Sequence, residues 1–89
     1  MSPEIQEYFE TYFELFSSDG WKQFMKDVKT EYQNVLSQMP SLETGEQMLV
    51  RKGELARMDW VAGTENIVRF HYDNMLAEEK AKAEDDADL

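Results

Sequence analysis

The chain has 89 residues, a formal net charge of −10 at pH 7, 42% hydrophobic residues and 12% aromatic residues. This length bounds the chain to one domain, and its apolar content is too high for global disorder. It contains no cysteine, which excludes disulfides and thiolate metal sites. No secretion signal and no apolar run of membrane-spanning length occur, so we expect neither secretion nor membrane insertion.

The negative charge lies at the two ends of the chain. Residues 1–20 carry five acidic residues and no basic residue, residues 21–60 carry six of each, and residues 61–89 carry eight acidic and three basic residues. This distribution disfavours direct binding to nucleic-acid phosphates or to anionic membranes. Its simplest role is solubility, and the alternative is an acidic surface for a basic protein partner.

A first amphipathic helix is predicted from Pro3, with Ser2 in the capping position. Its apolar residues recur at helical spacing, at Ile5, Tyr8, Phe9, Tyr12, Phe13 and Phe16. The Ser-Ser-Asp-Gly sequence at 17–20 then predicts a turn, in which Ser18 or Asp19 can cap the next helix.

The second predicted helix carries an apolar seam with spacings of four and three, which is typical of coiled-coil packing. The seam consists of Trp21, Met25, Val28, Tyr32, Val35 and Met39. Pro40 ends this helix, because proline disfavours helical geometry in the residue before it.

A third helix can begin at Ser41, or at Thr44, which forms a capping-box pattern with Gln47. We expect it to continue unbroken to about Ala83, and the alternative is a break at Gly63 and Thr64. Its seam consists of Leu49, Gly53, Ala56, Trp60, Gly63, Ile67 and Phe70. Glycine in a helix costs roughly 1 kcal/mol relative to alanine. The small residues therefore predict close approach of the second helix, with Trp21 or Tyr32 opposite them.

The predicted fold is all-α: a helical hairpin or three-helix bundle with a long third helix and coiled-coil-like packing. Residues 1–83 are predicted to form a single helical domain, and residues 84–89 an acidic, frayed tail. The third helix is about twice as long as the second, so apolar surface is left for the first helix or for another protein to cover. The residues predicted to make protein interactions are Tyr8, Tyr12, Phe16, Ile67, Phe70, Tyr72 and Met75.

No residue pattern predicts catalysis. His71 and Asp73 are two positions apart, on different faces of a helix, and make a poor metal pair. Ser17 and Ser18 have no histidine nearby in sequence. We therefore expect a protein that is not an enzyme and binds no metal or cofactor.

Three short motifs carry a resemblance: Leu15-Phe16, Asp19-Gly20-Trp21-Lys22, and Arg51-Lys52-Gly53-Glu54-Leu55 followed by Trp60. They resemble short, acidic, mostly uncharacterised helical proteins of tailed bacteriophages, particularly short-tailed ones. The resemblance covers about residues 15–62. It implies a phage origin and a virion or assembly role, and it supplies no catalytic residues. The expected location is the host cytoplasm or the virion.

Two functions follow as hypotheses. The first is a small, virion-associated structural or assembly protein that acts through helix–helix contacts, as a homo-oligomer or with another protein. The alternative is an acidic inhibitor of a host protein, including the case of a mimic of DNA charge.

Overall fold

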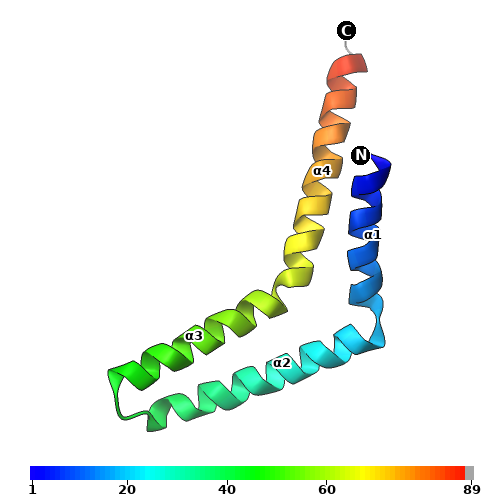
Figure 1. The fold of residues 1–89 in the computed structure, drawn as a ribbon. Coiled ribbons are helices and arrows are strands. Elements are labelled where there is room, and N and C mark those ends of the chain that lie inside the picture. Colours follow the sequence, from blue (N-terminus) through cyan, green and yellow to red (C-terminus); the bar gives the residue numbers. More distant parts are fainter. Residues whose placement is uncertain (88–89) are drawn as a thin grey trace. The chain divides into compact units, whose positions relative to one another are not determined.

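Helices make up nearly all of the described residues, 1–87, in the computed structural model (Figure 1). They are α1 (Pro3–Ser17), α2 (Asp19–Gln38), α3 (Gly45–Ala62) and α4 (Thr64–Ala87), with a 3-10 turn η1 (Met39–Ser41) after α2. The all-α prediction is confirmed. The chain divides into two compact units: unit 1 contains α1 and residues from Glu65 onward, and unit 2 contains Ser18–Thr64. The single domain predicted for residues 1–83 stays a prediction.

Serine side chains start the first two helices, as predicted. The Ile5 amide donates to Ser2 Oγ over 3.2 Å. The Trp21 amide donates to Ser18 Oγ over the same distance, and Ser18 has the extended backbone of an N-cap. Each cap satisfies an amide that the first helical turn leaves without a partner.

The third helix begins at the later of the two predicted starts. Ser41 lies in η1, where its hydroxyl donates to the Gln38 carbonyl instead of capping a helix. Thr44 and Gln47 form a complete capping box: the Gln47 amide donates to Thr44 Oγ1 over 3.1 Å, and Gln47 Oε1 accepts from the Thr44 amide. This reciprocal pair sets the first residue of α3.

The prediction of one unbroken third helix is wrong, because α3 ends at Ala62 and α4 begins at Thr64. Gly63 lies between them with φ −85° and ψ −4°. A Cβ atom at Gly63 would lie 3.2 Å from the Asp59 carbonyl oxygen, so this backbone suits glycine. Thr64 Oγ1 also donates to the Trp60 carbonyl, a side-chain bond that commonly bends helices.

The acidic tail is more ordered than predicted. Helix α4 continues to Ala87, so residues 84–87 are helical rather than frayed. The last two residues of the predicted tail, 88–89, lie outside the described residues.

Unit 1 is an antiparallel pair of helices. The amino group of Met1 pairs with the Glu79 carboxylate near one end. Further along α1, the Phe9 ring meets the Tyr72 ring, with centroids 5.2 Å apart. Because the partner numbers on α4 fall as the numbers on α1 rise, the two helices run in opposite directions.

Unit 2 is a helical hairpin in which α2 packs against α3. The predicted α2 seam is confirmed as the less exposed side of that helix: Val35 is buried, and the other five seam residues are half-buried. On α3, the half-buried side consists of Arg51, Glu54, Leu55, Met58 and Val61.

The predicted α3 seam is therefore wrong for this contact. Leu49, Gly53, Ala56 and Trp60 are all exposed, and a Cβ atom at Gly53 would have no neighbour within 4 Å. Neither Trp21 nor Tyr32 comes within 4 Å of a Cβ atom at Gly53. Leu55, Met58 and Val61 bury more apolar area than glycine and alanine do, and the free energy of burial scales with that area.

The capping box at Thr44 yields a stability prediction. Thr44→Ala should lower the free energy of unfolding by roughly 1 kcal/mol, because the Gln47 amide loses its acceptor. The matched control is Thr30→Ala in the middle of α2, where the hydroxyl only donates back to the Lys26 carbonyl. Urea denaturation should show a clear loss for the first variant and little change for the second. Equal losses would contradict the capping assignment.

The open space at Gly53 gives a second prediction about stability. Gly53→Ala should raise the free energy of unfolding by roughly 0.5–1 kcal/mol, because alanine is the better helix former and its methyl group meets nothing. Gly63→Ala is the control, since its methyl group would press on the Asp59 carbonyl. Thermal denaturation at low protein concentration should show stabilisation at position 53 only. A destabilised Gly53→Ala variant would restore the close-approach hypothesis.

Candidate interaction surfaces

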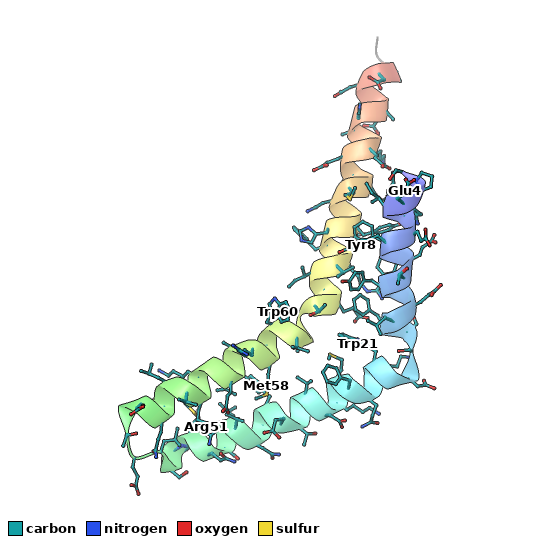
Figure 2. All side chains as sticks on the ribbon, in the orientation of Figure 1. Glu4, Tyr8, Trp21, Arg51, Met58 and Trp60 are labelled. Carbon is teal, nitrogen blue, oxygen red and sulfur yellow. The ribbon has the colours of Figure 1, made fainter. Side chains whose placement is uncertain are left out.

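The side of α3 that faces away from α2 is an exposed apolar stripe. Leu49 is 70% exposed at one end and Trp60 is 69% exposed at the other. Gly53 and Ala56 lie between them and are exposed as well. We call these four residues the α3 outward face. In Figure 2, Trp60 points away from α2, whereas Met58 and Arg51 point toward it.

The rotation of α3 that exposes this face comes from contacts on its other side. Met58 lines a shallow surface hollow together with Phe24 and Val28 of α2. Arg51 lies on the same side of α3 and binds both carboxylate oxygens of Glu54 through Nη1, over 2.8 and 2.9 Å, in a pair within the helix. Because residues three and four apart share one side of a helix, turning this side toward α2 leaves Leu49 and Trp60 on the outward side.

Charged residues line both edges of the α3 outward face. Lys52 and Asp59 are seven residues apart and lie on one edge, while Arg57 lies on the other edge. Among the described residues, none of the three takes part in an ion pair. Both signs of charge therefore remain available beside the apolar stripe.

An aromatic cluster joins the two helices of unit 1. The Tyr72 ring lies 5.2 Å from Phe9 and 5.1 Å from Phe13, edge-to-face in both pairs. The Arg69 guanidinium lies 5.1 Å from the centre of the Phe13 ring, and its Nη2 also donates to Glu65 over 3.4 Å. Such edge-to-face and cation–π geometries are the favourable ones for aromatic rings. The cluster thus accounts for the packing of α1 on α4.

The seven predicted interaction residues divide between packed and exposed positions. Phe16 is buried, and Tyr12, Tyr72 and Met75 are half-buried. Three are exposed: Tyr8, Ile67 and Phe70. Helix α1 therefore covers part of the α4 surface, which is one of the two alternatives stated from the sequence. Their role in binding another protein stays a prediction.

Tyr8 lies beside Tyr12 on α1. A hydrogen bond with Tyr12 raises the pKa of the Tyr8 hydroxyl above its ordinary value of 10.0. Charge repulsion from Tyr12 and desolvation raise this pKa further, by smaller amounts. Tyr8 stays protonated, and so able to donate, throughout the neutral range. It also lines a shallow groove of unit 1 with His71 and Glu78.

Metal-ligating groups do not gather in the described part of the chain: no three His, Cys, Asp or Glu side chains lie together there. Over the same residues, no helix has the length and apolar character needed to cross a membrane. Comparisons of this chain with protein-family models, with curated proteins and with solved structures give no match.

Sequence reasoning missed the residues of α3 that pack on α2. Arg51, Glu54, Leu55, Met58 and Val61 also recur at spacings of three and four. This second stripe was the sequence signal that could have identified the packed side of α3. It was not decisive, because apolar residues occur on all sides of α3. Phe9 and Phe13 were seen as apolar positions of α1, but their pairing with Tyr72 needed the fold.

The aromatic cluster can be tested on one helix. Tyr72→Leu keeps an apolar side chain but removes two edge-to-face contacts, so it should lower the free energy of unfolding by roughly 1–2 kcal/mol. The control is Phe70→Leu, whose ring is 62% exposed; it should change stability by less than about 0.5 kcal/mol. Urea denaturation of both variants makes the comparison. Equal effects would mean that the ring contacts add nothing to stability.

Proposed function

We propose that this protein is a small structural or assembly protein of a tailed bacteriophage that acts through helix–helix contacts with other protein surfaces. One observation carries the proposal: Leu49 and Trp60 stand exposed at the two ends of the α3 outward face. Tryptophan is among the residues that contribute most to protein–protein binding. Burying an apolar side chain of this size contributes roughly 1.5–3 kcal/mol.

The phage assignment rests on the sequence resemblance over about residues 15–62. Its Arg51–Leu55 motif and Trp60 both belong to α3. Within the motif, Arg51, Glu54 and Leu55 face α2, while Gly53 lies on the outward face with Trp60. The motif thus serves both the folding of the hairpin and the exposure of the stripe.

The test is incorporation into particles. Phage particles purified from infected cells should contain this chain when analysed by mass spectrometry. Leu49→Ser with Trp60→Ser should abolish incorporation, because the apolar face is lost. The control is Leu36→Ser with Leu76→Ser, which changes two exposed apolar residues outside α3 and should leave incorporation intact. Absence of the wild-type chain from particles and from assembly intermediates would overturn the proposal.

A second candidate is an acidic inhibitor of a host protein. The observation that favours it is the charge of unit 1, which has twelve acidic and three basic residues, against seven and six in unit 2. Glu4, Glu7, Glu10 and Glu14 are all exposed along α1. Such a surface attracts basic, nucleic-acid-binding proteins, and the attraction weakens as salt rises.

The inhibitor candidate makes its own prediction. The immobilised chain should retain a basic host protein at low ionic strength and release it as salt is raised. Replacing the four α1 glutamates by glutamine should weaken retention, whereas Leu49→Ser should not. Retention that is insensitive to salt would exclude charge as the basis of binding.

A further inference from the structure

We propose that the α3 outward face binds the same face of a second copy of this chain, in an antiparallel pair whose two-fold axis passes between Gly53 and Ala56. The inference rests on the proposed function, because it names the partner of the same surface. It is carried by the order of side-chain sizes along the face and by the charges on its edges.

The order of sizes along the face is symmetric. Leu49, Gly53, Ala56 and Trp60 read large, small, small, large in both directions along α3. In an antiparallel pair, Leu49 lies opposite Trp60 of the second copy, and Gly53 lies opposite Ala56 of the second copy. The small residues let the two backbones approach at the centre, while the large side chains bury apolar area at both ends. Open space beside Gly53 is what such an approach requires.

The edge charges distinguish the two directions of pairing. In the antiparallel pair, the two-fold axis is perpendicular to the helices, so the same edge of α3 from both copies lies together. Lys52 therefore meets Asp59 of the second copy, and by symmetry this contact occurs twice. In a parallel arrangement, opposite edges meet, and Lys52 faces Arg57 of the second copy. Opposite charges at the edge of a helix pair select its orientation, so the antiparallel arrangement is favoured.

Within residues 1–87, no other charge competes for Lys52 or Asp59. Lys52 and Asp59 form no ion pair among the described residues. Arg51 and Glu54 bind each other on the α2-facing side instead. Unit 2 also has only one more acidic than basic residue, so charge repulsion between two copies of it is small.

The size of the contact sets its strength. Helix α3 has 18 residues, which is roughly 27 Å of helix. A contact one helix wide and of this length buries less than the roughly 1,200 Å² that specific stable complexes need. The pairing should therefore be reversible and concentration-dependent, which analytical ultracentrifugation of the full chain can measure.

The first experiment exchanges the edge charges. Lys52→Asp and Asp59→Lys should each weaken self-association roughly three- to tenfold, because each change turns two attractive pairs into repulsive ones. The double variant K52D/D59K reverses both members of each pair and should return to the wild-type dissociation constant. Failure of the double variant to recover would overturn the edge pairing.

The second experiment reports direction. The chain has no cysteine, so introduced thiols are the only ones. Mixing Leu49→Cys chains with Trp60→Cys chains should give the mixed disulfide, since positions 49 and 60 meet. Positions 49 of the two copies lie 11 residues apart in the antiparallel pair, roughly 16 Å along the axis. That exceeds disulfide reach. Homodisulfides without the mixed product would establish parallel pairing and overturn the proposal.

A third variant separates pairing from folding. Gly53→Leu should abolish self-association, because its side chain fills the space for the second backbone, while circular dichroism shows unchanged helix content.

If the wild-type chain remains a monomer at millimolar concentration, the pairing is wrong, and incorporation into particles still tests the proposed function by itself. A dimer that is absent from particles would instead retain the pairing and overturn the phage role.

Discussion

The rotation of α3 about its own axis is the constraint on which the candidate surface depends. Leu55, Met58 and Val61 are drawn toward α2 because burying them removes the most apolar area from water. The Arg51–Glu54 pair lies on the same side of α3, where the two charges bind each other. Once these side chains are placed, the geometry of the helix leaves Leu49 and Trp60 on the opposite side.

The two units hold their helices together by different means. In unit 2, α2 packs on α3 through the α2 seam, and the short connection between the two helices contains η1. In unit 1, contact is made by rings, with Tyr72 between Phe9 and Phe13.

Helix starts and the α2 seam could be predicted from the sequence, and the α3 seam could not. Ser2, Ser18 and Thr44 are signals that depend only on residues within one turn, and each forms the expected bond. The α2 seam was clear because its large apolar residues lie on one side. Helix α3 offers two stripes with the same spacing, and only contact with α2 decides between them.

The same ambiguity explains the incorrect prediction about glycine. Two glycines on one stripe suggested close approach within the chain, but Gly53 faces open space and Gly63 marks a break in the helix. The break itself was the stated alternative. Backbone competition from Thr64 is a local effect that apolar spacing does not reveal.

The division of charge gives the exposed stripe its physical setting. Unit 1 carries nine more acidic than basic residues, and unit 2 only one more. Acidic surfaces repel one another and keep a chain soluble, while a neutral surface with apolar residues can associate. The apolar stripe with the highest exposure thus lies in the unit where association meets the least electrostatic opposition. Screening by salt would relieve repulsion between copies of unit 1 and also weaken the Lys52–Asp59 contacts. Because apolar burial does not depend on such screening, the stripe rather than its edges would dominate binding at high salt.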